Sequence, residues 1–316
     1  MARKRYENYN NVCTTRTFLD LLRWSRERRA KKKDLTIQIP QHGAKQIKEL
    51  YHNQNFPSIT WIGHSTFLIQ LNGVNILTDP VWSKRMGFQK RLTRPGIPID
   101  ELPKIDLVLI SHGHYDHLSF GSIKKLKGDP TFFVPIGLGC AFKRRGYDQV
   151  VEADWWDHLR FDSVDFTFVP AQHWTRRTLT DMNTSRWGGW VIENTALDRC
   201  IYFVGDTGYF EGFKEIGDKF NHDIVLMPIG AYEPEWFMQQ THINPEDAIK
   251  AFVELKGKLF IPMHYGAYRL ADDTGPEALE RMYREWNRLK RTGDSLAVLK
   301  LGETLWLKNK GSQPID

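Results

Sequence analysis

The stretch Ile110-Ser111-His112-Gly113-His114-Tyr115-Asp116-His117 determines how the rest of this sequence is interpreted. It follows an apolar run at residues 106–110 that predicts a buried strand. Four metal-binding side chains lie within six residues of it: His112, His114, Asp116 and His117. In an extended loop, side chains two residues apart project to the same side, so the first two histidines can face one ion. Asp116 and His117 follow in a turn that can face a second ion, and the segment therefore predicts a metal centre.

Three further residues of the same kind follow predicted strands farther along the chain: His173, Asp206 and His264. Asp206 is the least ambiguous of them, because Gly205 and Gly208 leave the backbone free where an acid emerges from a strand. A single histidine would more often be structural, but seven such residues at strand ends indicate two ions. A pair of ions is the standard means of activating water and stabilising a leaving oxygen.

Composition indicates an ordinary folded domain. The chain has 316 residues, of which 41% are hydrophobic and 26% charged, and this excludes a disordered or fibrous protein. No apolar run approaches the ~18 residues of a membrane-spanning helix, and no apolar segment follows the basic N-terminal residues to form a secretory signal. The three cysteines lack Cys-x-x-Cys spacing. We therefore expect a cytoplasmic protein without a disulfide framework.

The positive charge is concentrated at the N-terminus. Residues 1–34 carry 11 Lys and Arg against 4 acids, a net charge of +7, whereas the remaining 33 basic and 34 acidic residues leave a net charge of −1. Phe18, Leu22 and Trp24 lie among these basic residues, so a short helix there can lie peripherally on an anionic membrane. The alternative is a helix that is solvated or docked on the protein. A nucleic-acid partner is not expected, because no basic surface continues into the body.

Apolar runs and turn signals predict one α/β domain at residues 41–316, preceded by a basic N-terminal arm at residues 1–40. Strands are expected at residues 58–62, 66–71, 74–78, 106–110, 131–134, 164–169, 189–193, 200–204, 223–227, 259–262, 296–299 and 304–307. Helices are expected at residues 120–126, 138–145, 211–219, 245–255 and 276–290, and a long loop at residues 85–103. Asn72-Gly73 is a strong hairpin signal, because both residues tolerate positive φ.

The His-x-His-x-Asp-His pattern with a distant His, Asp and His resembles the signature of the metallo-β-lactamase fold superfamily. The resemblance implies an αββα four-layer sandwich with the site at one edge, between the sheets. It also implies the ligand sets: His112, His114 and His173 for one ion, Asp116, His117 and His264 for the other, and Asp206 as the bridge. The implied cofactors are two divalent metal ions per chain, zinc first, with manganese or iron as alternatives.

Further segments look like the family of phospholipases D that hydrolyse N-acyl-phosphatidylethanolamine. They include Trp61-Ile62-Gly63-His64-Ser65-Thr66, Leu77-Thr78-Asp79-Pro80, Gln172-His173-Trp174, Gly205-Asp206-Thr207-Gly208-Tyr209 and His242-Ile243-Asn244-Pro245-Glu246. The similarity extends over residues 59–307. Three features depart from the family pattern: Asn244 stands where an acid is expected, the N-terminal arm has no counterpart, and most of residues 85–94 is unmatched.

Several residues outside the ligand set are candidates for the site. Arg176 and Arg177 are expected to bind a substrate phosphate, because a guanidinium matches phosphate geometry; a solvated charge pair is the alternative. We expect His242, with a pKa near neutrality, to contact substrate and donate a proton to the departing alkoxide; fastening its loop is the alternative. Asp116 is the second expected catalytic residue.

For Asp79, His64 and the tryptophans near the predicted site, a purely structural role is the alternative to a functional one. Asp79 either orients a ligand imidazole or simply ends a strand before Pro80. His64 is expected to be structural, and most of the tryptophans are expected in the core.

The resulting functional prediction is a dinuclear metal-dependent hydrolase, a phosphodiesterase of phospholipase D type acting on N-acyl-phosphatidylethanolamine-like phospholipids. A hydroxide bridging the two ions would attack phosphorus, which agrees with the lack of a Gly-x-Ser-x-Gly nucleophile motif. A lactonase or sugar-phosphate lactonase would use the same ligands and is the alternative. A nucleic-acid phosphodiesterase is a weaker alternative, because the body carries a net charge of −1. The sequence does not indicate an oligomeric state.

Overall fold

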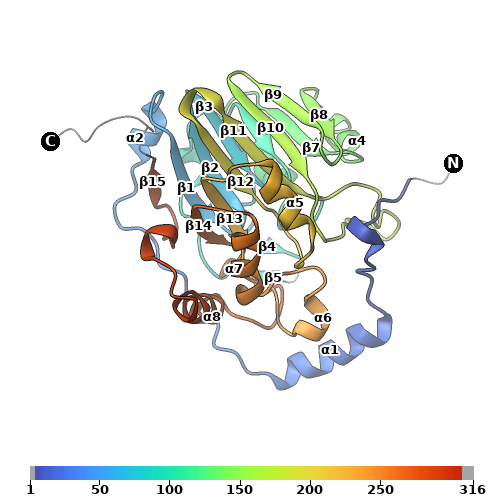
Figure 1. Ribbon diagram of the computed structural model, residues 1–316. Coiled ribbons are helices and arrows are strands. Elements are labelled where there is room, and N and C mark those ends of the chain that lie inside the picture. The colour runs from blue at the N-terminus through green and yellow to red at the C-terminus, as the bar shows by residue number, and fades with distance from the viewer. Residues whose placement is uncertain (1–3, 88, 308–316) are drawn as a thin grey trace.

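The computed structural model describes residues 4–87 and 89–307, which form two β-sheets packed face to face with helices on both outer faces (Figure 1). The first sheet contains, in spatial order, β15 (Thr304–Trp306), β1 (Ser58–Gly63), β2 (Thr66–Leu71), β3 (Val74–Thr78), β6 (Leu107–Leu109), β7 (Thr131–Pro135) and β8 (Val150–Ala153). The second contains β14 (Leu259–Met263), β13 (Ile224–Pro228), β12 (Arg199–Phe203), β11 (Gly189–Asn194), β10 (Val164–Val169) and β9 (His158–Phe161). The expected αββα four-layer sandwich is confirmed.

The helices are short and cover the two sheets unequally. They are α1 (Phe18–Ala30), α2 (Ile47–His52), α3 (Phe120–Ile123), α4 (Gly139–Lys143), α5 (Gly212–Lys219), α6 (Glu235–Met238), α7 (Pro245–Glu254) and α8 (Gly275–Arg288). In Figure 1, α5 and α7 lie over the second sheet, and α4 lies beside β7 and β8. Within the described residues, no helix combines the length and apolar character needed to cross a membrane.

Both faces of the central strands are buried, as the strand β2 illustrates. Phe67 and Ile69 point into the large central core, which the second sheet shares. Leu68, between them, points the other way and packs in a cluster with Ile123 of α3 and Phe142 of α4. Alternate residues of a strand face opposite sides, so a strand covered on both sides is apolar throughout.

The direction of the strands brings the ends of several of them to one edge. β3, β6, β7 and β8 run parallel in the first sheet, and β12, β13 and β14 run parallel in the second. β10 has the same direction as β12, because each is antiparallel to β11. The loops after β6, β10, β12 and β14 carry the seven predicted metal ligands, so this shared edge positions the site.

The N-terminal arm is docked along the body, which was one of the two alternatives for it. The arm helix α1 begins at a capping box formed by Thr17 and Asp20, and it lies next to α6 (Figure 1). Trp24 stacks on Phe237 of α6 with ring centroids 4.8 Å apart, and its Nε1 donates to Asp272 Oδ2 at 3.2 Å. Ion pairs extend the contact after the helix, where Lys31 and Lys33 both reach Glu233.

The structure differs from the sequence prediction at several edges. Residues 296–299 form a single bridge, between Phe260 and Leu296, in place of the expected strand. The strands β8 and β9 were not predicted, because their exposed edge positions interrupt the apolar pattern. The loop expected at residues 85–103 contains a short ribbon of β4 (Arg85–Met86) and β5 (Gln89–Lys90). The Asn72-Gly73 hairpin is confirmed, with φ of 49° and 82°.

Candidate metal centre

The structure brings all seven predicted ligands together around the carboxylate of Asp206. Asp206 Oδ2 lies 3.1 Å from His117 Nε2 and 3.0 Å from His264 Nε2. The same oxygen lies 3.9 Å from His173 Nε2 and 4.0 Å from His112 Nε2. Asp206 can take this central place because Gly205 before it has a φ of 70° and packs against Gly188 and Ser111 too closely for a Cβ atom.

The first triad, His112, His114 and His173, presents three converging ring nitrogens. His114 Nδ1 lies 2.9 Å from His112 Nε2 and 3.2 Å from His173 Nε2. Burial lowers the pKa of all three rings, that of His114 to about 4, so they are neutral at pH 7. Neutral imidazole is the form that binds a metal ion.

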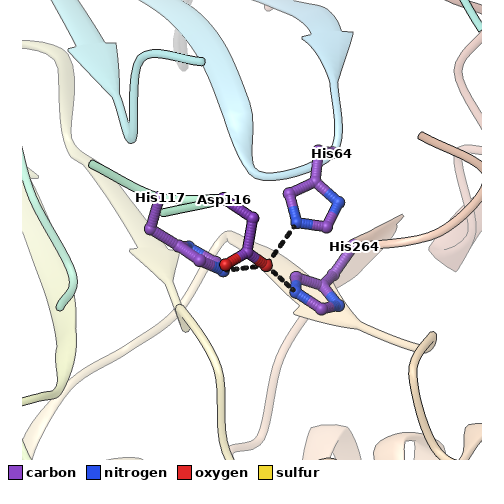
Figure 2. A group of neighbouring side chains, drawn as sticks. All are labelled: His64, Asp116, His117 and His264. Carbon is purple, nitrogen blue, oxygen red and sulfur yellow. Dashed lines mark hydrogen bonds and ion pairs between the residues drawn. The ribbon is translucent and has the colours of Figure 1, made fainter. Parts of the chain in front are cut away.

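The second triad, Asp116, His117 and His264, has the opposite electrostatics. Asp116 Oδ2 lies 3.3 Å from His117 Nε2 and 3.5 Å from His264 Nε2 (Figure 2). Burial alone would lower the pKa of both histidines, but Asp206 and the neighbouring carboxylates outweigh it. They raise the pKa of His117 well above its ordinary value and that of His264 to about 9. In the metal-free protein, these rings therefore carry the positive charge that a cation would supply.

The donor atoms of the cluster fit a bound divalent ion. Asp206 Oδ1 is buried and has no hydrogen-bond partner among the described residues, and the buried His117 Nε2 and His264 Nε2 face only the carboxylates of Asp116 and Asp206. Buried atoms without a partner are rare in folded proteins, and a coordinated ion would satisfy this one. Imidazole nitrogen and carboxylate oxygen suit zinc, iron and manganese. The cluster is therefore able to bind metal.

Outer partners orient the ligand rings. His117 Nδ1 donates to Asp79 Oδ2 at 2.6 Å, and Ser111 donates to the same carboxylate through Oγ at 2.5 Å and through its backbone N–H at 2.8 Å. His173 Nδ1 donates to the carbonyl of Thr241 at 2.8 Å. Each bond holds the proton on Nδ1 and leaves Nε2 facing the cluster. Of the two readings of Asp79, the structure supports the orienting one.

His64, expected to be a structural histidine, lies directly beside the second triad and is close enough to serve as a further ligand. Its Nε2 lies 3.1 Å from Asp116 Oδ2, and its ring is 4.1 Å from that of His264 (Figure 2). The residue is buried with a φ of 58°, a conformation that is costly for a side chain of this kind and that functional sites often contain. The sequence signals were its place at the end of an early strand and within the family-like segment Trp61-Ile62-Gly63-His64-Ser65-Thr66.

His242 lies at the open side of the cluster, close to the position predicted for it. Its Nδ1 is 3.8 Å from Asp206 Oδ2, its ring is 5.1 Å from that of His173, and its side chain is 16% exposed. The partly exposed Trp174 lies 4.6 Å from the ring of His114. Burial lowers the pKa of His242 to about 4, so the expectation of a value near neutrality was wrong. The ring is neutral at pH 7 and offers one N–H donor.

The two arginines after His173 do not act alike, and the phosphate-binding role expected for Arg177 needs correction. Its Nη1 donates to the backbone carbonyls of Gly113 at 2.7 Å and Leu118 at 3.0 Å, and its guanidinium lies 4.1 Å from the ring centroid of Tyr115. Arg177 thus stabilises the metal-binding loop through its backbone carbonyls. Arg176 is exposed, and its Nε donates to the carbonyl of Thr178 within its own loop.

Comparison with known proteins agrees with this fold and site. Residues 74–265 match the beta-lactamase superfamily domain. The N-acyl-phosphatidylethanolamine-hydrolyzing phospholipase D 1 of Caenorhabditis elegans is 36% identical over 75% of this chain and 71% of its own length. The mitochondrial phospholipase D of the same description from Saccharomyces cerevisiae is 33% identical over 78% of this chain. The match spans only 55% of the yeast relative.

A solved structure supports the same fold. Igni18, a metallo hydrolase from the hyperthermophilic archaeon Ignicoccus hospitalis, superposes with a TM-score of 0.60 over 81% of this chain and 100% of its own, at 21% identity. The chain belongs to the metallo-β-lactamase superfamily. It is a metal-dependent hydrolase, and its sequence is similar to those of the N-acyl-phosphatidylethanolamine-hydrolysing phospholipases D.

Proposed function

We propose that this protein is a phospholipase D-type phosphodiesterase that uses two divalent ions, zinc in the first instance, to hydrolyse N-acyl-phosphatidylethanolamine-like phospholipids. The observation that carries the proposal is the carboxylate of Asp206 in reach of two complete ligand triads. A bridging carboxylate between two triads is the arrangement for hydrolysis by a pair of ions. The names of the worm and yeast relatives support the choice of substrate.

In this proposal, the protein's own residues have separate tasks. Two ions held by the triads would supply an acidified water as nucleophile and positive charge against the phosphate. Asp79 and the carbonyl of Thr241 keep the ligand rings in the correct tautomer. His242 donates a hydrogen bond to the leaving oxygen of the phosphodiester. Because the cluster is buried, such a hydrogen bond is worth more than it would be in water.

Three substrates test the proposal: an N-acyl-phosphatidylethanolamine in mixed micelles, an aryl phosphodiester and a lactone. Hydrolysis in ¹⁸O-labelled water should place the label in phosphatidic acid, because the attack is on phosphorus. Asp206→Ala should abolish turnover and lower the metal content, whereas His158→Ala, on the exposed strand β9, should change neither. Faster turnover of the lactone than of either phosphodiester would refute the proposed reaction.

We further propose that the outer face of α1 contacts anionic membrane. Phe18, Leu19 and Leu22 are 71%, 74% and 51% exposed, and the exposed Arg26 and Arg29 share their side of the helix. An apolar face beside cationic side chains suits an anionic lipid surface. The opposite side of α1 packs on α6, which precedes His242 by a few residues, so lipid bound there lies near the open side of the cluster.

Vesicle binding tests this surface without removing the arm. Phe18→Ser combined with Leu22→Ser should weaken binding to phosphatidylcholine vesicles that contain phosphatidylserine, and salt should weaken the binding of wild type. Leu289→Ser, at an exposed site after α8, is the matched control. Turnover of a soluble aryl phosphodiester should stay unchanged in all variants. Equal vesicle binding by the double variant and wild type would refute the proposed lipid contact.

A further inference from the structure

Residues 8–14 of the arm form a tight reversal against the metal centre. Asn10 and Asn11 both have a φ of 56°, a left-handed conformation that asparagine tolerates better than most residues. The reversal places Asn8 beside Thr14, and Asn8 Nδ2 donates to Thr14 Oγ1 at 3.3 Å. Both side chains are buried, each with only 6% of the residue exposed.

Asn8 and Thr14 together take up both backbone polar groups of His173. The N–H of His173 donates to Asn8 Oδ1 at 2.9 Å, and Thr14 Oγ1 donates to the carbonyl of His173 at 3.3 Å. Asn8 Oδ1 also accepts from Trp187 Nε1 at 3.0 Å, which fixes the amide on the core. His173 is fully buried, so each of its backbone groups needs a protein partner.

The remaining polar atoms of His173 are fixed by the body of the protein. Its Nδ1 donates to the carbonyl of Thr241, and its Nε2 lies 3.2 Å from His114 Nδ1. The ring is thus oriented from one side, and its backbone is held from the other. Ions such as zinc require ligand distances within a few tenths of an ångström, so the position of this backbone bears directly on coordination.

The geometry points to Asn8 and Thr14 as positioning residues of the metal centre, which makes the arm part of the site. They act through His173 and contact no ligand atom themselves. Their loss should weaken ion binding by the first triad and leave the second triad largely unchanged. The inference rests on the metal-binding role of His173 in the proposed function, and it holds for any substrate.

Metal affinity, measured by chelator competition with zinc and by the visible absorption of the cobalt-substituted protein, tests the inference. Thr14→Val keeps the shape of the side chain but removes its hydroxyl, and Asn8→Leu removes the amide. Each should lower the affinity for one of the two ions by about 10- to 100-fold and alter the visible spectrum of the cobalt bound there. Thr14→Ser should restore both readouts. Thr15→Val, at an exposed neighbouring position, should behave as wild type.

The outcomes separate this inference from the proposed function. If Thr14→Val binds both ions with wild-type affinity and an unchanged cobalt spectrum, the positioning role is wrong; this isosteric variant decides even if Asn8→Leu fails to fold. Wild type that binds two ions but hydrolyses no phosphodiester would refute the function and leave the positioning role standing. Wild type that binds no ion would overturn both.

Discussion

The replacement of Asp79 by asparagine should disable the second triad by reversing a tautomer. In the wild type, the carboxylate accepts from His117 Nδ1, so His117 Nε2 is free to bind an ion. In the Asp79→Asn variant, the new amide would face this nitrogen with its NH₂ donor, because its oxygen stays bound to the backbone N–H of Ser111. The proton of His117 would then move to Nε2, which is the ligand atom 3.1 Å from Asp206.

The structure also indicates how much metal affinity the Asp79→Asn variant should lose, and how this loss compares with that of Asp79→Ala. Loss of an outer partner weakens metal binding by roughly 10- to 100-fold. The reversed tautomer places Asp79→Asn at the upper end of that range, about 2.7 kcal/mol of binding free energy. Asp79→Ala should be milder, because it leaves His117 free to choose either tautomer.

Chelator competition with zinc measures these affinities, and ¹⁵N chemical shifts of labelled histidine report the tautomer directly. Asp129→Asn is the control, since Asp129 is exposed and remote from the cluster. An Asp79→Asn variant that binds the second ion more tightly than Asp79→Ala would refute the tautomer argument.

Other predictions concern the pH dependence of metal binding and the roles of His242 and Arg177. In metal-free protein, His117 and His264 are protonated at pH 7, and an ion must displace these protons; zinc binding by the second triad should therefore weaken as the pH falls below about 9. The first triad should keep its affinity toward pH 4, where His114 titrates, and calorimetry over a pH series separates the two. His242→Ala should reduce turnover of a phospholipid by about 100-fold, with much less effect on an aryl phosphodiester and none on metal content; equal losses on both substrates would contradict its role at the leaving oxygen. Arg177→Met should lower the free energy of unfolding in urea by about 3 kcal/mol, because three loop carbonyls lose a charged donor, whereas Arg176→Met should have almost no effect.

The sequence indicated the seven candidate ligands because four lie close together on one loop and three follow predicted strands, whereas their division into two triads came from the family resemblance. The residues from His112 to His117 lie on one loop, and strand direction brings the distant ligands to the same edge. The contacts of Asn8 and His64 could not be predicted in this way. Asn8 pairs with a residue 165 positions away, and no periodic pattern records such a contact. His64 lies beside the second triad only because β1 ends at the same edge as β14, where His264 follows.

Contacts between residues far apart in the sequence also explain the wrong predictions at the sheet edges and for Arg177. β8 and β9 are held by pairing to β7 and β10, and not by apolar alternation of their own. Residues 296–299 are apolar throughout, as in a buried strand, but form only one bridge, between Leu296 and Phe260. Arg177 was predicted to bind phosphate because the sequence shows its charge. The sequence does not show that the carbonyls of Gly113 and Leu118 accept hydrogen bonds from it.

The docking of the arm imposes an order of events during synthesis. Asn8 and Thr14 are synthesised before their partner His173, which follows 165 positions after Asn8. At ribosomal speeds of about 5–20 residues per second, the arm waits roughly 8–33 s before that partner exists. The partners of α1, such as Phe237 and Asp272, arrive later still. During this interval the arm has no docking partner, so the segment that holds the backbone of His173 is made before that residue and can dock only after it.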